Sequence, residues 1–340
     1  MRVGAVLVLA LALSVPGCGG SGPASPSPSA ADTFLARHVT GDGRVIRHDQ
    51  GGDIVSEGQA YAMLLAEAAG RPERVRTIWS WTAAHLRGPD GLFAWHATGS
   101  GDVLDPQSAT DADVLIAYGL LRYAGPGAPE LHAQGRRVAP AVLAREAVAL
   151  PDGAPLLVAG PWARATSPPT VNPSYLMPGI FAALARLTGD GRWARAASAA
   201  VTAVRDLTAD GRRLPPDWAV LAGRRLLAAP APDGGAGVQY GQDAARLPVW
   251  FATACDPDAR ALAGRWWQNV LSSAVPSGGS PLSLMAGAAA ATAAGDTEPA
   301  SQLRHRAAAL ATRSPTYYGD AWAALGPALL DGAIEPCRRS

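Results

Sequence analysis

Acidic side chains able to perform acid–base chemistry occur at three places in the chain, each at the start of an apolar segment. The three clusters are Ser56-Glu57-Gly58-Gln59, Thr110-Asp111-Ala112-Asp113 and Asp243-Ala244-Ala245-Arg246. Two carboxyl groups on either side of a glycosidic bond, one protonated and one ionised, can hydrolyse that bond. Acidic residues are also common at helix starts, where they satisfy free N–H groups and favour the helix dipole. Each cluster taken alone therefore permits a structural role, and Ser56 with Gln59 fits a capping box.

Aromatic residues accompany the carboxylates along the sequence, which favours a sugar as the ligand. The accompanying rings are Trp95, Tyr175, Trp218, Tyr317 and Tyr318. An aromatic face packs against the C–H face of a sugar, and carboxylates accept hydrogen bonds from its hydroxyls. Packing in the core is the alternative for each ring.

Other chemistries find little support. The histidines show no H-E-x-x-H spacing, and there is no G-x-S-x-G sequence. The glycine-rich stretch 234–237 lacks the strand and helix that flank a phosphate-binding loop. We therefore expect neither a metal ion nor a cofactor.

From about Asp32 onward the sequence predicts one helix after another, because apolar residues recur at helical spacing between Gly, Pro and Asp clusters. Runs of alternating β-branched residues are scarce, which argues against a large sheet. The stretch from Pro216 to Ala229 is either a helix or an irregular connector. Helix starts are expected near Asp32, Glu57, Pro72, Ala109, Arg137, Ser174, Asp190, Asp243, Asp256, Pro281, Pro299 and Gly319.

Two kinds of helix alternate along this series. The helices starting near Glu57, Ala109, Ser174, Asp243, Pro281 and Gly319 are apolar on nearly every side. A helix that is apolar all round is buried all round, whereas the intervening segments carry charges on one face. This alternation predicts a double ring of helices in which the three acidic clusters meet at one end. A helical solenoid is the main alternative, but no fixed repeat period is visible.

Length and composition fit one large domain, predicted over residues 32–340. The chain has 340 residues, of which 48% are hydrophobic. The net charge of +1 gives no sign of a basic surface that would bind nucleic acid. We expect the protein to be a monomer.

The N-terminus predicts export. Residues 1–17 carry Arg2 and then an apolar run that is too short to span a bilayer, as in a signal peptide. The sequence before Cys18 resembles a bacterial lipobox, which predicts lipidation of Cys18; an ordinary signal peptide is the alternative. Residues 18–31 are mostly Gly, Ser, Pro and Ala and are expected to form a disordered tether. The protein would then lie at the outer face of the cell membrane or be secreted.

Two further cysteines, Cys255 and Cys337, follow the fourth and sixth buried helices. They should lie at the end of the barrel away from the acidic clusters. In an oxidising compartment they can form a disulfide, and two free thiols are the alternative.

The motifs together resemble glycoside hydrolase family 8 from about Asp32 to Leu330. Ser56-Glu57-Gly58-Gln59-Ala60-Tyr61-Ala62-Met63 is similar to the family motif S-E-G-Q-S-Y-G-M, and Ala109 to Asp113 is similar to its A-[ST]-D-[AG]-D signature. Further matches in family order are Asn172-Pro173-Ser174-Tyr175, Pro216-Asp217-Trp218, Asp243-Ala244-Ala245-Arg246 and Tyr317-Tyr318-Gly319-Asp320.

The resemblance implies an all-α fold, an (α/α)6 barrel of six inner and six outer helices, and an inverting, endo-acting hydrolase. It places Glu57 as general acid, Asp243 as base and Asp111 as the residue that contacts the sugar at the cleavage site. It places Tyr175 beside the attacking water and Arg246 near the base. Trp95 falls close to a stacking tryptophan, and further substrate contacts are expected from Asp113, Trp218, Tyr317 and Tyr318.

The sequence departs from the family pattern in two places. Gln242 stands where the family usually has Tyr before the base, with Tyr240 two residues earlier, and Gly119 replaces Ala or Ser in the second signature. The expected substrate is a β-1,4-glucan such as cellulose, with chitosan and xylan as alternatives. A sugar-binding lipoprotein without activity and a polysaccharide lyase are the competing classes. The lyase fits less well because its chemistry needs a basic or tyrosyl proton abstractor.

Overall fold

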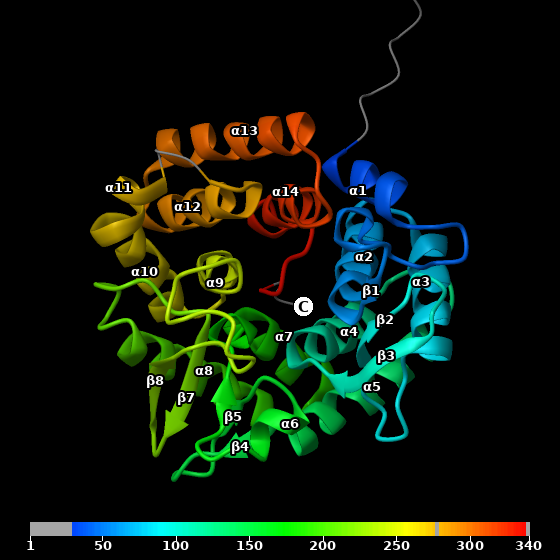
Figure 1. Ribbon diagram of the computed structural model, residues 1–340, viewed down its shortest axis with the longest axis horizontal. Coiled ribbons are helices and arrows are strands. Elements are labelled where there is room, and N and C mark those ends of the chain that lie inside the picture. Colours follow the sequence, from blue (N-terminus) through cyan, green and yellow to red (C-terminus); the bar gives the residue numbers. More distant parts are fainter. Residues whose placement is uncertain (1–28, 276–278, 338–340) are drawn as a thin grey trace, which may run out of the picture.

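Residues 29–275 and 279–337 are described by a computed structural model, in which the helices form two concentric rings (Figure 1). In this part of the chain six helices make up the inner ring and six the outer ring. The inner helices are α2 (Ser56–Ala68), α4 (Thr110–Arg122), α7 (Pro178–Thr188), α9 (Leu247–Ala252), α12 (Pro281–Ala294) and α14 (Tyr317–Leu330). The outer helices are α1 (Ala30–His38), α3 (Pro72–His85), α5 (Ala128–Arg145), α8 (Gly191–Leu207), α10 (Pro257–Trp266) and α13 (Thr297–Arg313).

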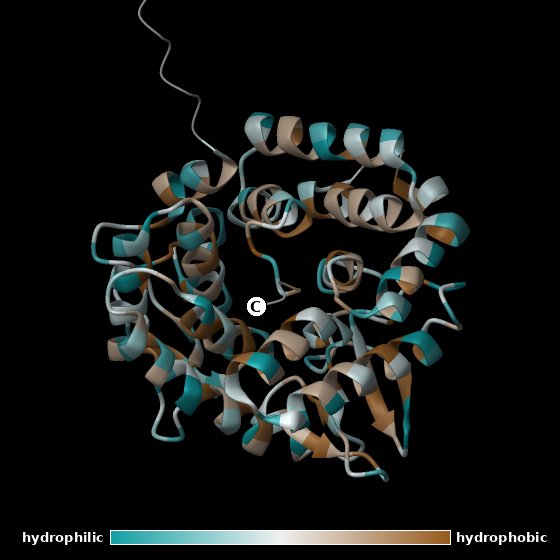
Figure 2. Ribbon diagram, turned by 180° about the vertical axis from the view of Figure 1, so that it is seen from behind, coloured by the Kyte–Doolittle hydropathy of each residue, from teal (hydrophilic) through white to brown (hydrophobic). Residues whose placement is uncertain are grey.

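The inner helices are inside because they offer no polar face to water. In α12 every residue from Leu284 to Ala291 is buried, so the helix has neighbours on all sides. In α13 the buried residues are Ala300, Leu303, Ala307 and Ala311, which recur at helical spacing along one face. Figure 2 shows the corresponding alternation of hydrophilic and hydrophobic turns along α13. The predicted all-helical double ring is confirmed.

The first and last helices close the ring. Helix α1 packs against α14, and both Arg37 and His38 at its end reach Asp320 in the first turn of α14. The His38 Nε2 atom lies 2.9 Å from Asp320 Oδ2. Helix α1 begins at Ala30, where the Ser29 side chain accepts a hydrogen bond from the Asp32 N–H group and caps the helix. This helix thus starts two residues before the predicted position.

Three small antiparallel sheets connect the helices. One joins β1 (Ile54–Val55), β2 (Ala94–Ala97) and β3 (Val103–Ser108), and a second joins β4 (Ala147–Ala149) and β5 (Pro155–Leu157). The third contains β6 (Thr170–Val171), β7 (Trp218–Ala222) and β8 (Arg225–Ala229).

The stretch from Pro216 to Ala229 contains a β-hairpin, so both alternatives considered from the sequence were wrong. Ala219 and Leu221 are buried while their neighbours are more exposed, which is the alternation of a half-buried strand. Gly223 has a φ of +62°, the left-handed conformation that a tight turn between two strands requires. The short run of small apolar residues hid this alternation.

Helix α5 begins at Ala128, nine residues before the predicted start at Arg137. Gly135 and Pro140 both lie inside the helix, although such residues commonly mark a break. A Cβ atom on Gly135 would come within 2.6 Å of the Leu121 side chain, so this glycine permits close packing on α4. Pro140 is exposed, and its missing hydrogen bond therefore leaves a carbonyl that water can reach.

Shorter helical segments complete the fold. Helix α10 continues through a π-helical turn, η4 (Trp267–Leu271), into α11 (Ser272–Ala274), and α6 is the short helix Pro161–Arg164. The 3-10 turns are η1 (His48–Gln50), η2 (Pro173–Tyr175) and η3 (Ala244–Arg246). The helices predicted to start at Ser174 and Asp243 therefore begin as 3-10 turns, with α7 and α9 following.

The segment after α14 closes one end of the barrel and runs toward the centre of the ring (Figure 1). Ile334 is fully buried, and Arg122 on α4 donates a hydrogen bond of 3.0 Å to the Ala333 carbonyl. A disulfide joins Cys255 to Cys337 with 5.2 Å between their Cα atoms, within the usual range. Of the two alternatives open from the sequence, the structure contains the bonded pair.

The predicted signal peptide and Cys18 lie outside the described residues. Within residues 29–275 and 279–337, none of the helices has the length and apolarity needed to cross a bilayer.

Candidate active site

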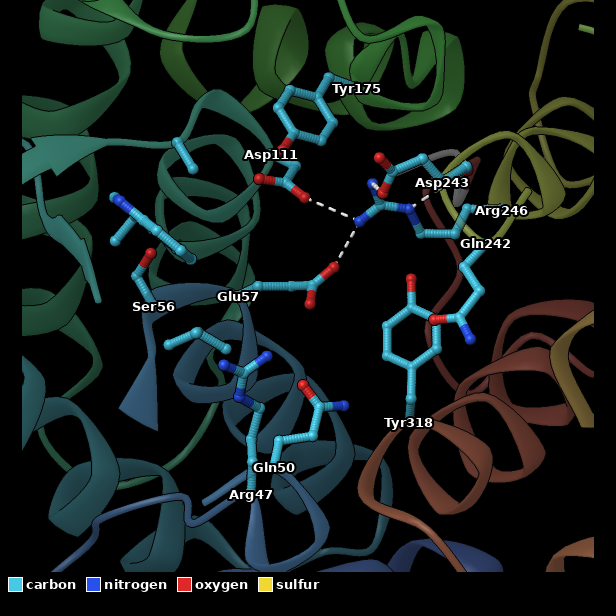
Figure 3. A pocket seen from close by; sticks show the side chains of 13 residues that line it. Arg47, Gln50, Ser56, Glu57, Asp111, Tyr175, Gln242, Asp243, Arg246 and Tyr318 are labelled. Atoms are coloured by element: carbon cyan, nitrogen blue, oxygen red, sulfur yellow. Dashed lines mark hydrogen bonds and ion pairs between the residues drawn. The ribbon is translucent and has the colours of Figure 1, made fainter. Parts of the chain in front are cut away.

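The acidic clusters meet at one end of the barrel because the inner helices that carry them point the same way. Glu57 lies in the first turn of α2, Asp111 in the first turn of α4 and Tyr318 in the first turn of α14. Tyr175 ends η2 and Asp243 directly precedes η3. These residues line one cleft of about 210 Å³, hereafter the cleft, shown in Figure 3.

Arg246 is the centre of the cleft. Its Nη1 atom donates to Glu57 Oε1 and, at 2.9 Å, to Asp111 Oδ2, while its Nη2 atom donates to Asp243 Oδ1 at 2.7 Å. The arginine side chain is 4% exposed, so these charge-assisted bonds are formed largely away from water. Three carboxylates from three distant parts of the sequence are thus held around one guanidinium group.

Neighbouring polar groups fix the directions of Glu57 and Asp243. The Tyr61 hydroxyl donates to Glu57 Oε1 at 2.7 Å. Burial and the nearby charge of Glu57 raise the pKa of Tyr61 well above its ordinary value, so this hydroxyl keeps its proton. The Asn172 amide donates to Asp243 Oδ2 at 3.0 Å. The Asp243 carboxylate therefore has a fixed direction while 34% of its side chain stays exposed to the cleft.

The loop before Asp243 is held by Asp217. The Asp217 carboxylate accepts hydrogen bonds from the N–H groups of Gly241 and Ala244, at 3.0 and 2.8 Å. A Cβ atom on Gly241 would lie 2.2 Å from Asp217 Oδ2, so a larger residue there would displace the Asp217 carboxylate. The motif residue Asp217 thus positions the segment that carries Asp243.

Glu57 is placed by Gln59 rather than by a capping box. The side chain of Gln59 is fully buried; it accepts from the Val45 N–H group at 2.7 Å and donates to the Gly43 carbonyl at 3.0 Å. It also donates to the Thr82 hydroxyl at 2.8 Å. Gln59 therefore fastens the start of α2 to the preceding loop and to α3.

The acidity of Asp111 is shifted toward neutral pH. Burial raises the pKa of Asp111 to about 7; the charge of Arg246 opposes this rise, and the charges of Glu57 and Asp243 add to it. A single guanidinium does not neutralise three ionised carboxylates. The proton of Asp111 is therefore exchanged close to neutral pH.

A second hollow continues the cleft on one side. Its volume is about 460 Å³, and it shares Trp95, Ala109 and Tyr175 with the cleft. Trp162 and Trp218 form its wall, with ring centres 6.4 Å apart. We call this hollow, lined by Trp95, Trp162 and Trp218, the tryptophan groove. Together with the cleft it makes an extended, aromatic channel beside the carboxylates.

Two polar residues in the cleft were missed from the sequence, Arg47 and Gln50. Arg47 donates from Nε and Nη2 to the two oxygens of Asp53, at 2.8 and 2.5 Å. Asp53 also bonds His96, whose ring stacks on Trp95 with 4.7 Å between centroids.

Trp162, in Gly160-Pro161-Trp162, was missed as well. Arg47, Gln50 and Trp162 gave no signal in the sequence, because short elements between the main helices bring them to the channel.

Two of the predicted substrate contacts lie away from the channel. Asp113 and Tyr317 are 0% and 1% exposed, and neither lines the cleft or the tryptophan groove. A helix turns 100° per residue, so Asp113 points almost opposite to Asp111, and Tyr317 points about 100° away from Tyr318. Asp113 accepts a hydrogen bond from the Phe93 N–H group at 3.0 Å, and Tyr317 packs on Phe34. The structure therefore places both side chains in the packed interior rather than on the channel wall.

The other predicted contacts do reach the channel. Tyr175, Tyr318 and Trp95 line the cleft, and Trp218 lines the tryptophan groove. Tyr175 faces Arg246, with its ring centre 5.3 Å from the guanidinium carbon. Gln242, the departure from the family pattern, lies in the cleft beside Tyr318 (Figure 3).

The fold is a double ring of helices, and its site pairs carboxylates with an aromatic channel. Both features are typical of enzymes that hydrolyse polysaccharides. Residues 21–327 match the family model described as glycosyl hydrolases family 8. A probable endoglucanase of Novacetimonas hansenii is 30% identical over 276 residues, which cover 74% of this chain and 76% of that protein.

Solved structures agree in fold. An endo-β-1,4-glucanase of Acetobacter xylinum is 25% identical with a TM-score of 0.70, covering 90% of this chain and 99% of that one. A β-1,3-1,4-glucanase of Paenibacillus sp. X4 is 21% identical with a TM-score of 0.77, covering 89% and 90%. The chain belongs to glycosyl hydrolase family 8, and it is a glycoside hydrolase.

Proposed function

We propose that the protein cleaves β-1,4-linked glucan within the polymer chain and with inversion, using Glu57 as acid and Asp243 as base. The observation that carries this proposal is the grouping of Glu57, Asp111 and Asp243 around Arg246 in a cleft that continues into the tryptophan groove. The names of the endoglucanase relatives support glucan as the substrate.

In the proposed reaction Glu57 gives its proton to the glycosidic oxygen as the bond to the anomeric carbon breaks. A water molecule attacks that carbon from the opposite face, and Asp243 accepts the water's proton. Inverting hydrolases keep their two carboxyl groups about 6.5–9.5 Å apart to admit this water. Glu57 and Asp243 bond different nitrogens of Arg246, so both carboxyl groups face the same cleft.

Asp111 and Arg246 would act on the sugar at the cleavage site and on the base. Asp111 is nearly buried beneath the cleft and is placed to accept a hydrogen bond from a sugar hydroxyl. Such a bond favours the distorted ring that precedes cleavage. Arg246 orients Asp243 through a charge-assisted hydrogen bond, which suits a general base.

The tryptophan groove would bind the polymer on one side of the scissile bond. Three indoles along one channel offer flat apolar faces to successive sugar rings. A channel open along its length suits attack inside a chain rather than removal of end sugars.

We further propose that the protein is exported and held at the outer face of the membrane by a lipid on Cys18. The support is the short apolar run and the lipobox-like sequence before Cys18. Metabolic labelling with a fatty acid tests this directly: label should enter the wild type and be absent from Cys18→Ser. Equal labelling of both would contradict the anchor.

The enzymatic proposal is tested by product analysis on carboxymethylcellulose, mixed-linkage β-glucan, xylan and chitosan. Reducing-sugar release should be greatest on a β-1,4-glucan, and NMR should show the α-anomer forming first. Glu57→Gln and Asp243→Asn should each lower kcat by about 10³-fold or more. Glu67→Gln is the matched control, because it alters a carboxyl on the same helix that is paired with Arg122 outside the cleft.

Wild-type rates in purified Asp243→Asn on every polymer would refute the assignment of the base. Rapid hydrolysis of xylan or chitosan alone would replace the proposed substrate but keep the reaction. An unsaturated product absorbing in the ultraviolet would identify a lyase instead.

A further inference from the structure

A second pair of carboxyl groups lies directly behind the cleft, and the proposed reaction does not use it. Asp113 on α4 and Glu146 at the end of α5 are both 0% exposed. Their carboxyl groups are within hydrogen-bonding distance of each other, and the Ser108 hydroxyl lies beside both. Ser108 Oγ donates to Glu146 Oε1 at 2.6 Å.

One oxygen of each carboxyl lacks a donor. If both carboxyl groups are ionised and can only accept hydrogen bonds, neither Asp113 Oδ2 nor Glu146 Oε2 has a donor among the described residues. Two ionised carboxylates side by side in a buried site are strongly disfavoured. A single proton between them would supply the missing hydrogen bond and remove one of the two charges.

The pair connects the elements that carry the cleft residues. Asp113 accepts from the Phe93 N–H group, two residues before Trp95 on β2. Glu146 holds Ser108, the last residue of β3, and Asp111 follows three residues later in the first turn of α4. One wall of the cleft is therefore tied to the barrel through these two side chains.

We propose that Asp113 and Glu146 share one proton and act as positioning residues that hold the start of α4, and with it Asp111, against strands β2 and β3. The kinetic part of this inference rests on the proposed function. The part concerning the shared proton does not, because stability measurements test it without any substrate.

The proton makes stability depend on pH with a defined sign. Burial raises the pKa of Glu146 to about 8, and the charged groups that act on it are Asp113 and Asp111 on α4 and Asp90 in the turn before β2. An unfolded glutamate has a pKa near 4.3. The folded protein therefore keeps a proton that the unfolded chain releases, and the stability from this proton is lost as pH rises toward about 8.

The first test compares Tm at pH 6 and pH 9 in the wild type, Glu146→Gln and the control Asp190→Asn. The amide introduced by Glu146→Gln donates to Asp113 without a titrating proton. Between pH 6 and pH 9 the Tm of this variant should therefore fall by about 3–6 °C less than the Tm of the wild type. Asp190 caps α8 at the surface, and the Tm of Asp190→Asn should decrease from pH 6 to pH 9 by the same amount as that of the wild type. Equal losses in Glu146→Gln and the wild type would overturn the shared proton.

The second test measures kcat and KM at pH 6 on the best polymer. Glu146→Gln should keep kcat within about threefold, whereas Glu146→Ala should lower kcat at least about tenfold with a smaller change in KM, because a displaced Asp111 stabilises the transition state less. Wild-type kcat in folded Glu146→Ala would overturn the positioning role. Should Glu146→Ala not fold, Ser108→Ala takes its place: a kcat lowered severalfold supports the role, and an unchanged kcat overturns it.

Discussion

Replacement of Arg246 by methionine should destabilise the protein in a manner that depends on pH. Arg246 is 4% exposed and binds Glu57, Asp111 and Asp243, whose side chains are 18%, 6% and 34% exposed. A hydrogen bond to a buried charged group contributes about 1.5–3 kcal/mol. The bond to Asp243 contributes little to stability because water screens this more exposed carboxylate. The expected loss of stability therefore comes mainly from the bonds to Glu57 and Asp111. We expect a loss of about 3–5 kcal/mol at pH 8, the usual result of leaving buried charges unpaired.

At pH 5 the loss should be much smaller. Without the guanidinium, the pKa of Asp111 rises further above about 7, the value it has with Arg246 present. Its folded pKa then lies well above its unfolded value, so stability is present at low pH and lost as pH rises. Urea unfolding of the wild type and Arg246→Met at both pH values measures this difference. The control is Arg71→Met, which removes an exposed ion pair with Asp32 and should cost less than about 1 kcal/mol at either pH.

Two results would refute this reasoning. A loss below about 1 kcal/mol at pH 8 would mean that Arg246 does not hold the carboxylates. An equal loss at both pH values would mean that the cost arises from packing and not from charge.

Three further predictions concern the channel, the disulfide and Asp111. Trp95→Ala and Trp162→Ala should each raise KM for the polymer about 5- to 20-fold in initial-rate measurements, because each removes one stacking surface; an unchanged KM would place the polymer elsewhere. Reduction of the disulfide, or the double variant Cys255→Ser/Cys337→Ser, should lower the free energy of unfolding by about 4 kcal/mol, since the two cysteines are 82 positions apart and the bond closes a long loop; equal urea midpoints before and after reduction would contradict this. Asp111 has a folded pKa of about 7, above its unfolded value, so its contribution to stability falls as pH rises from about 4 to 7. Asp111→Asn should lack this part of the decline in Tm, and an unaltered pH dependence would argue against a protonated Asp111.

The ring of inner helices could be predicted because its signal is local. A helix with buried residues all round, such as α12 or α4, can be placed in the interior from composition alone. The end of the barrel at which the carboxylates meet then follows from helix direction. The hairpin of β7 and β8 was missed although its pairing is local, because its short run of small apolar residues hides the alternation of a half-buried strand.

Side-chain direction decides which of the predicted residues reach the cleft. Asp111 and Asp113 belong to one motif, yet the helix turns them to opposite faces, and only Asp111 lines the cleft. Of Tyr317 and Tyr318, which are turned about 100° apart, only Tyr318 lines the cleft. Trp162 stayed hidden because it lies on α6, a helix of four residues that leaves no periodic pattern in the sequence. A motif therefore indicates the neighbourhood of the site, and helix geometry determines which members face it.

Closure of the ring by α1 and α14 has a consequence for biosynthesis. Asp320 bonds Arg37 and His38 across more than 280 positions of sequence, so the first helix finds its partner only when the last one has been made. A nascent chain that ends before α14 leaves the apolar faces of α1 and α2 uncovered and lacks Tyr318 in the cleft. Contacts of such long sequence separation form late and slow the folding of the whole domain. The polypeptide therefore reaches its active shape only after α14 has been synthesised.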